Sequence, residues 1–305
     1  PRYLKENGYS TVSVGKIYHY NDDDPDGWTV RHTDTFYEQD YTCHGYCSGY
    51  QSEKNRRKLH NFSLQFGPTD KSEIELPPLC ECVDAPDSAY PDGVIAERSI
   101  EVLREFAGSS VPFFLAAGFY RPHLPWAVPK KYWDLYDRAE VDLADNPFFP
   151  KDSIGISDLC DFLHYGDDVI DDTYSDIGRY RGDNFPTLPE EKQRECVHGY
   201  WASVSFMDAQ VGKLLQELKR LGLEKDTLIV FWGDNGWHLG EHNLWSKVTS
   251  FEESTRVPLI VATGDSRATG ATAASDDSRT AGGSATDALV ELIDIYPTIC
   301  EYARS

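Results

Sequence analysis

Apolar side chains recur along this chain with two different spacings. Four short runs are dominated by apolar or β-branched residues, which is typical of strands buried in a sheet. These runs are residues 11–14, 113–117, 227–232 and 257–261. Three longer stretches repeat apolar residues every three or four positions, which predicts amphipathic helices. These stretches are residues 92–106, 187–221 and 288–302. Strands that alternate with helices predict an α/β fold with a largely parallel central sheet flanked by helices.

The ends of two helical stretches leave alternatives open. Thr187 and Glu190 have the spacing of a capping box, in which two side chains satisfy the first backbone N–H groups of a helix. The helix that starts there is expected to run to residue 221, as one helix or as two with a break. The stretch at 288–302 is either one helix or a pair of helices.

Three segments lack a regular hydrophobic period. Residues 21–91 are rich in Asp, Gly, Pro, Tyr and Cys, and residues 137–186 are irregular and acidic. Both are expected to be loop-rich insertions. Residues 264–287 consist mostly of Ala, Ser, Thr, Gly and Asp, which predicts a flexible low-complexity loop. We expect all three within one domain that spans residues 1–305.

The charge balance limits the classes of partner. Among 305 residues, 29 are Lys or Arg and 51 are Asp or Glu, so the formal net charge is −22. A surface this acidic repels nucleic acid and anionic lipid, and neither is expected as a partner. The chain contains no run of about 18 apolar residues, so we expect no membrane insertion. A local basic pocket within this acidic surface is still compatible with an anionic substrate.

The seven cysteines fall into two groups. Four flank one polar stretch, and they are Cys43, Cys47, Cys80 and Cys82. No pair of histidines at zinc-finger spacing accompanies them, so a disulfide-tied loop in an oxidising compartment is favoured over a metal site. The other three have apolar or helical surroundings and are expected to be buried thiols. They are Cys160, Cys196 and Cys300.

The clearest chemical signal follows the run at 227–232. Gly233-Asp234-Asn235-Gly236 comes directly after that predicted strand. Open α/β sheets bind ligands at the carboxyl ends of their strands. The carboxylate of Asp234 and the amide oxygen of Asn235 are hard ligands that suit Ca²⁺ or Mg²⁺. The alternative is a tight turn, because the same residue types form turns.

Cationic, aromatic and titratable side chains follow each of three predicted strands. Lys16 and His19 come after the run at 11–14, and His123 comes after the run at 113–117. Trp237 and Lys247 lie beyond the 227–232 strand. Aromatic walls with a cation between them suit a bound anion, although each group alone is equally typical of a solvated loop. Convergence of three strand ends predicts an active site.

At this point the sequence resembles a known family. Residues 3–20 contain G-K-x-x-H, residues 112–136 contain P-H-x-P, and residues 200–261 carry the G-D-N-G segment. In this order they resemble type I sulfatases of the alkaline phosphatase superfamily, most of all the iduronate-2-sulfatases and their bacterial relatives. The resemblance implies a sulfuric ester hydrolase that removes sulfate from a sulfated carbohydrate.

The resemblance also implies roles for particular residues. Asp234 and Asn235 match a pair of ligands for Ca²⁺, with Mg²⁺ as the alternative metal. The residues that match groups contacting sulfate or the reacting atoms are Lys16, His19, His123 and Lys247, and Trp237 is expected to bind substrate. The family acts in secreted, periplasmic or lysosomal compartments. Its iduronate sulfatases often have His in place of Asn235, which weakens a narrow substrate assignment.

The chain departs from the family pattern at the nucleophile. These sulfatases use a formylglycine made from Cys or Ser in a C/S-x-P-x-R motif, and no such motif occurs here. The family's early Asp-Asp metal pair lies well upstream of G-K-x-x-H, whereas 15 residues precede Lys16. We therefore expect a fragment that is incomplete at both ends, with the formylglycine in a missing N-terminal part. Two alternatives are a non-catalytic pseudo-sulfatase that binds sulfated glycans and a phosphodiesterase or phosphonate hydrolase of the same superfamily.

The missing nucleophile gives a direct prediction. The purified 305-residue chain is expected to release no sulfate from an aryl or glycan sulfate, because it lacks the motif from which formylglycine is made. Turnover is measured by sulfate release, with a complete sulfatase as the positive control. Release that rises in proportion to the concentration of the chain would contradict this expectation.

Overall fold

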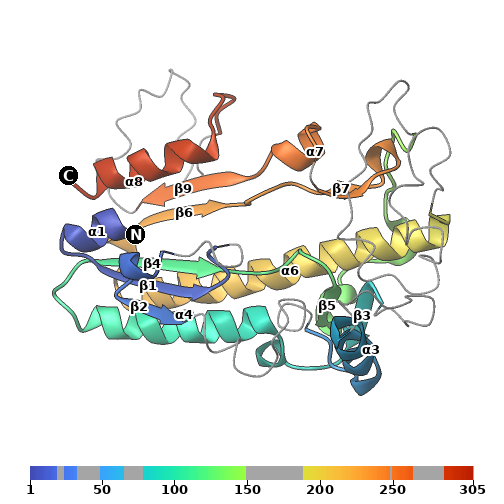
Figure 1. Cartoon of the computed structure of the whole chain (residues 1–305), viewed down its shortest axis with the longest axis horizontal. Coiled ribbons are helices and arrows are strands. Elements are labelled where there is room, and N and C mark those ends of the chain that lie inside the picture. The colour runs from blue at the N-terminus through green and yellow to red at the C-terminus, as the bar shows by residue number, and fades with distance from the viewer. Residues whose placement is uncertain are drawn as a thin grey trace.

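A parallel three-stranded sheet forms the first half of the fold. The computed structural model describes residues 1–18, 24–32, 49–64, 78–148, 188–247, 249–263 and 285–304. Strand β1 (Ser10–Gly15) lies between β2 (Val30–His32) and β4 (Phe113–Gly118) (Figure 1). Both neighbours run parallel to β1. The runs predicted at 11–14 and 113–117 are therefore strands, and the α/β class is confirmed.

Helix α4 (Pro91–Ala107) packs against β1 and β4. Val12 and Val14 of β1 form one buried cluster with residues of the apolar stripe of α4, among them Ile95 and Val102. Burial of these side chains stabilises the sheet through the hydrophobic effect. The helix predicted at 92–106 is confirmed, and its packing holds β1 and β4 in place.

Glycines allow β1 and β4 to end in close contact. Gly15 pairs with Gly118 in the parallel register and has φ +77°. A Cβ on Gly118 would lie 1.7 Å from the carbonyl oxygen of Lys16. Only a residue without a side chain fits there, so the chain can turn at Lys16 against the end of β4.

A second strand pair is antiparallel. Strand β6 (Leu228–Trp232) pairs with β9 (Leu259–Thr263), and the ladders of the described residues do not join this pair to β1 or β4. Figure 1 shows the pair above the β2–β1–β4 sheet. The strand expected at 257–261 starts two residues later, because Pro258 cannot donate a ladder hydrogen bond. Its direction also differs from the largely parallel sheet that the sequence predicts.

Two smaller pairs lie near the long helix. Strand β3 (Cys80–Val83) runs parallel to β5 (Trp126–Pro129), and β7 (His238–Leu239) forms a hairpin with β8 (Trp245–Ser246). Both pairs contact helix α6 (Glu190–Arg220). They place the segments around His123 and Lys247 over one helix.

Helix α6 (Glu190–Arg220) is a single helix of 31 residues without a break. It spans most of the molecule in Figure 1. Its buried side chains join two core clusters, one around Trp126 and one around Phe206. Pro189 precedes the helix, while the expected cap Thr187 lies outside the described residues.

The sequence analysis did not predict one helix, and it predicted another to be longer than it is. Helix α3 (Glu53–Leu64) lies within the region expected to be loops. At the other end, residues 285–291 are not helical, and α8 (Ile295–Tyr302) follows a 3₁₀ turn.

The short helices and 3₁₀ turns are α1 (Arg2–Glu6), α5 (Lys130–Trp133), α7 (Glu252–Thr255), η1 (Pro25–Gly27), η3 (Asp87–Ala89), η4 (Arg138–Glu140), η7 (Glu224–Asp226), η8 (Glu241–Asn243) and η10 (Leu292–Asp294).

The described cysteines are thiols. Cys80 and Cys82 are free, so the expectation that they tie a loop by disulfides is wrong. Cys80 faces α6, where its Sγ lies 3.8 Å from the carbonyl oxygen of Glu195, and burial raises its pKa. Cys196 and Cys300 are buried thiols, as expected. The other three cysteines lie outside the described residues, namely Cys43, Cys47 and Cys160.

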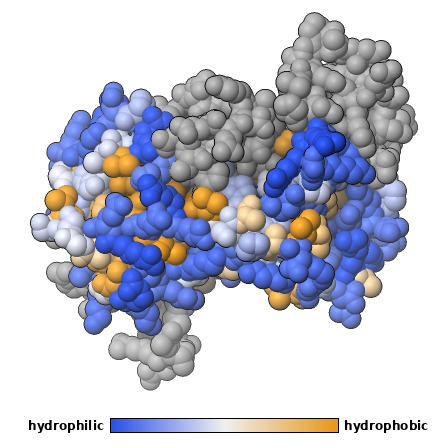
Figure 2. Space-filling view, turned by 90° about the horizontal axis from the view of Figure 1, so that it is seen from below, coloured by the Kyte–Doolittle hydropathy of each residue, from blue (hydrophilic) through white to orange (hydrophobic). Residues whose placement is uncertain are grey.

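The surface is mostly hydrophilic, as the composition predicts. Seen from below, polar residues cover most of the described surface and apolar groups form separate patches (Figure 2). In the described part of the chain, no helix combines the length and apolarity needed to cross a membrane.

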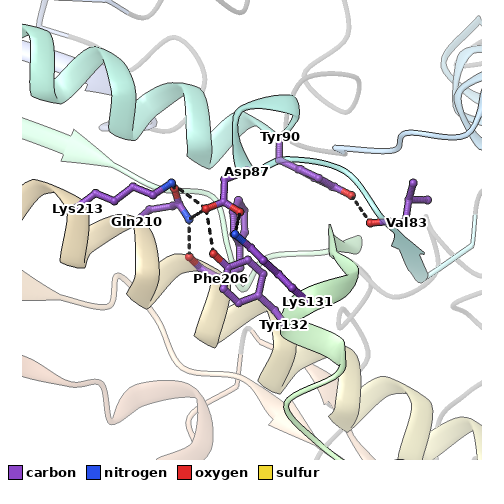
Figure 3. Close-up of polar contacts among 8 residues, drawn as sticks. All are labelled: Val83, Asp87, Tyr90, Lys131, Tyr132, Phe206, Gln210 and Lys213. Carbon is purple, nitrogen blue, oxygen red and sulfur yellow. Dashed lines mark hydrogen bonds and ion pairs between the residues drawn. The ribbon is translucent and has the colours of Figure 1, made fainter.

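One buried carboxylate joins three helical elements. Asp87 of η3 accepts hydrogen bonds from Tyr132 (3.0 Å) and Gln210 (3.2 Å), and it forms ion pairs with Lys131 (2.7 Å) and Lys213 (2.8 Å) (Figure 3). Burial alone would raise the pKa of Asp87, but the hydrogen bonds from Lys131, Lys213 and Gln210 outweigh it and lower the pKa to about 2. The ionised carboxylate therefore holds η3 against α5 and α6.

The low pKa of Asp87 makes stability depend on pH. An acid whose pKa falls on folding stabilises the protein above its unfolded pKa, and this contribution is lost as the pH falls towards the folded value. We expect Asp87→Asn to lower the free energy of unfolding near pH 6 by about 1–2 kcal/mol, allowing for solvent around the two lysines. The difference from the wild type should shrink between about pH 4 and pH 2.

The measurement is urea denaturation at several pH values, with the exposed Asp226→Asn of η7 as the control variant. An Asp87→Asn difference that is constant from pH 6 to pH 2 would show that the carboxylate charge is not what stabilises this junction.

Candidate functional site

The loops after β1 and β6 meet at an ion pair. Lys16 follows the last residue of β1, and Asp234 follows β6 after one glycine. The Lys16 Nζ donates to Asp234 Oδ2 over 3.1 Å. Residues far apart in the sequence therefore share one end of the fold, as the strand-end pattern predicts.

Two lysines determine the charge state of Asp234. Burial alone would raise its pKa, but Lys16, Lys247 and a backbone hydrogen bond together outweigh that effect, and the pKa falls below its usual value. The Asp234 side chain is still 69% exposed. An ionised carboxylate with two nearby ammonium groups leaves a net positive charge at this end of the sheet, which favours an anion.

The β7–β8 hairpin brings Trp237 and Lys247 together. His238 pairs with Ser246, so Trp237 and Lys247 are the next residues at the open end of the hairpin. The Lys247 Nζ lies 6.0 Å from the centre of the Trp237 ring, at the limit of a cation–π contact. One short hairpin therefore presents a cation and an aromatic wall side by side.

His123 completes the group from the loop after β4. Its ring meets the Trp237 ring edge to face, with centroids 6.0 Å apart. Its Nδ1 lies 2.7 Å from the carbonyl oxygen of Leu124. A carbonyl only accepts, so Nδ1 carries a hydrogen and Nε2 is the atom at which this ring can take up or release a proton. We call the residues linked by these contacts the strand-end cluster, which consists of Lys16, His123, Asp234, Trp237 and Lys247.

The hairpin turn depends on unusual backbone angles. Gly240, His242 and Asn243 all have φ between +58° and +111°. The Glu241 carboxylate accepts from the Leu239 N–H over 2.6 Å, which closes the turn on itself. The His242 ring stacks on Phe251 with centroids 4.3 Å apart. These contacts hold a left-handed turn that most side chains avoid.

Other polar and aromatic residues of this stretch support the hairpin. His238 is fully buried, and its Nε2 lies 2.8 Å from Thr249 Oγ1. Burial lowers the pKa of the His238 imidazole although nearby carboxylates oppose this. Trp245 is buried in the core cluster with Trp126, so it is not a wall of the cluster.

The two residues expected to bind a metal ion follow each other just after β6. Asp234 and Asn235 lie side by side and exposed, and both offer oxygen. The Asn235 Nδ2 donates to the Gly236 carbonyl, which leaves the amide oxygen for a ligand. Calcium takes six to eight oxygen ligands. Within the described ranges, no group of three or more His, Cys, Asp or Glu could hold a metal ion, and Asp234 and Asn235 together offer two oxygen atoms.

The other predicted residues have mixed outcomes. The structure brings together Lys16, His123, Asp234, Trp237 and Lys247, whereas His19 lies outside the described residues. Sequence reasoning gave no role to Glu241, although its place in the tight turn before Trp245 and Lys247 is visible in the sequence. The positive φ at His242 and Asn243 had only a weak signal, because these residue types adopt left-handed angles more often than other side chains but far less often than glycine.

The comparisons with known proteins agree on the family. The family model described as Sulfatase matches residues 1–305. The chain is 33% identical over 274 residues to iduronate 2-sulfatase of Homo sapiens, covering 85% of this chain and 44% of that protein. It is 29% identical over 322 residues to a sulfatase of Formosa agariphila, covering 100% of this chain and 53% of that protein. The chain spans about half the length of these curated relatives.

A solved structure supports the fold. The structure of BT4656 in complex with its substrate D-glucosamine-2-N,6-O-disulfate matches with a TM-score of 0.51 and 17% identity, over 86% of this chain and 55% of that one. At this identity the match concerns the fold alone. The family model covers the whole chain and the motifs meet at one site in space, so this protein belongs to the sulfatase family.

Proposed function

We propose that this chain carries part of the active site of a sulfuric ester hydrolase that acts on a sulfated carbohydrate, as an iduronate-2-sulfatase-like enzyme does. The observation that supports the proposal most strongly is the strand-end cluster itself, in which two ammonium groups act on one carboxylate and an imidazole meets the same indole ring as one of them. Membership of the sulfatase family supports the same reaction. The acidic net charge of −22 suits a secreted, periplasmic or lysosomal location.

The two lysines are proposed to hold the sulfate. A sulfate ester carries negative charge on its sulfur-bound oxygens, and further negative charge develops on the leaving oxygen as the S–O bond breaks. Fixed cations stabilise that charge best when they are already in place before the reaction. Lys16 and Lys247 meet this condition because Asp234 lies close to both of them.

His123 is proposed to protonate the leaving oxygen. Its Nδ1 hydrogen is used by the Leu124 carbonyl, so the proton is transferred from Nε2. Trp237, which contacts both His123 and Lys247, is proposed to bind the sugar and to keep water from this side. His19 is proposed to act beside the formylglycine.

Calcium, with magnesium as the alternative, is the proposed cofactor. When bound, the metal would neutralise charge on the sulfate, and Asp234 and Asn235 would supply two of its oxygen ligands. The formylglycine is proposed to come from outside these 305 residues, because no C/S-x-P-x-R motif occurs among them. The remaining metal ligands are proposed to come from residues outside the described part of this chain.

A second candidate is a sulfated-glycan-binding protein without catalysis. The observation that favours it is the absence of a C/S-x-P-x-R motif from the 305 residues. Both candidates require an anion site at the strand-end cluster, and they differ in whether a complete protein turns over substrate.

Binding of inorganic sulfate tests the anion site. We expect calorimetry to detect sulfate binding by the wild-type chain, and Lys16→Ala or Lys247→Ala to weaken it by about tenfold, since one charged hydrogen bond is lost in each. Lys225→Ala, which removes an exposed lysine of η7, is the matched control and should bind like the wild type. Wild-type-like binding by both cluster variants would refute the proposal.

The pKa of Asp234 tests the electrostatics of the cluster. Lys16 and Lys247 both lower this pKa, so Lys247→Ala is expected to raise it towards its usual value, and Lys16→Ala to raise it further. The measurement is a pH titration of the carboxyl carbon by NMR. An Asp234 pKa that is the same in Lys247→Ala and Lys225→Ala would mean that Lys247 does not act on this carboxylate.

A further inference from the structure

A buried acid of α4 holds the loop that carries His123. Asp92 lies in the first turn of α4 and is 1% exposed. One carboxylate oxygen accepts from the Tyr120 N–H over 2.8 Å, and the other accepts from the Arg121 N–H over 2.9 Å. Both oxygens of one buried side chain are therefore bonded to the backbone just before His123.

Arg121 connects the backbone of this loop at His123 to the following strand β5. Its side chain is 5% exposed, and its guanidinium donates to the carbonyl oxygen of His123 over 3.1 Å and to that of Ala127 over 3.4 Å. Ala127 belongs to β5, so the guanidinium joins the loop to the next strand. Burial raises the pKa of Asp92, and the charge of Arg121 and the two backbone N–H groups oppose that rise.

The loop backbone in turn fixes the His123 ring. The ring Nδ1 is held by the carbonyl of Leu124, and the ring edge meets Trp237. A shift of the backbone at residues 120–123 moves both the ring and the carbonyl that orients it. A displacement of about 1 Å is enough to weaken a catalytic contact strongly.

We propose that Asp92 is a positioning residue for His123. It acts through the N–H groups of Tyr120 and Arg121 and through the Arg121 guanidinium, and it does not touch the anion itself. The inference rests on the proposed function, in which His123 contacts the sulfate group.

Asp87 provides a matched control close in sequence. It is also a buried acid, in the 3₁₀ turn η3 that precedes α4, with four side-chain partners on α5 and α6, and none of these partners belongs to the loop of His123. Its loss should lower stability to a similar degree without moving the His123 ring. A general loss of stability and a loss of positioning can therefore be told apart.

The test measures sulfate affinity by calorimetry in a double-mutant cycle. We expect His123→Ala to weaken sulfate binding by about tenfold, and Asp92→Asn to weaken it by about three- to tenfold, because an amide nitrogen cannot accept from the second N–H. The double variant is expected to bind like His123→Ala alone, and Asp87→Asn like the wild type.

Two further measurements separate the outcomes. The ¹⁵N shifts of the His123 ring are expected to change in Asp92→Asn and to stay unchanged in Asp87→Asn, whether or not sulfate binds. Arg121→Lys keeps the positive charge but loses the two-pronged guanidinium. It is expected to change the ¹⁵N shifts of the His123 ring in the same direction, and it replaces Asp92→Asn in the test if that variant does not fold.

The positioning role is overturned if the His123 ring shifts of these variants match those of the wild type, or if the losses in Asp92→Asn and His123→Ala add in the double variant. Absence of sulfate binding by the wild type would instead overturn the proposed function, while the ring shifts would still decide whether Asp92 positions His123.

Discussion

The contact between Lys16 and Asp234 is the interaction on which the account depends, because it joins the end of β1 to the end of β6. Its strength cannot be what holds the two sheets together. The side chains are 30% and 69% exposed, and ion pairs with this exposure contribute only about 0–1 kcal/mol. The backbone and the core must therefore bring the two residues to this distance. What the contact provides is a place where positive charge exceeds negative charge, on a protein whose net charge is −22.

Different parts of the core position each member of the strand-end cluster. The apolar cluster between α4 and β1 determines the position of Lys16, and the close approach of Gly15 and Gly118 lets the chain turn there. The left-handed turn after β7 sets Trp237 and Lys247 as neighbours. Asp92 is proposed to play the same part for His123. Each functional side chain thus stands on a loop, while the group that orients it is buried.

Much of this arrangement could be predicted from the sequence. The apolar runs at 113–117 and 227–232 were long enough to indicate strands, and Lys16, His123 and Asp234 stood just after such runs. The meeting of these residues follows from the general rule that ligands bind at the carboxyl ends of strands. The resemblance to the sulfatase family was recognised from the motifs that contain these residues and from their order in the sequence.

The remainder was hidden for physical reasons. Helix α3 is mostly polar, so it lacks the apolar stripe that reveals a helix, and the two-residue strands β7 and β8 are too short to show a period. Asp92 resembles an ordinary acid of a first helical turn, since burial and backbone partners at residues 120 and 121 appear only in three dimensions. The disulfide expectation failed for Cys80 and Cys82, because cysteine spacing does not show that Cys80 lies in a strand against α6.

The central claim is that one anion site is shared by residues from three strand ends. The most direct measurement is an NMR titration of the chain with inorganic sulfate, following the Lys16 and Lys247 ammonium signals and the His123 ring together. The account predicts that all three respond with one common dissociation constant. Three different constants, or a response from only one of the three residues, would contradict it.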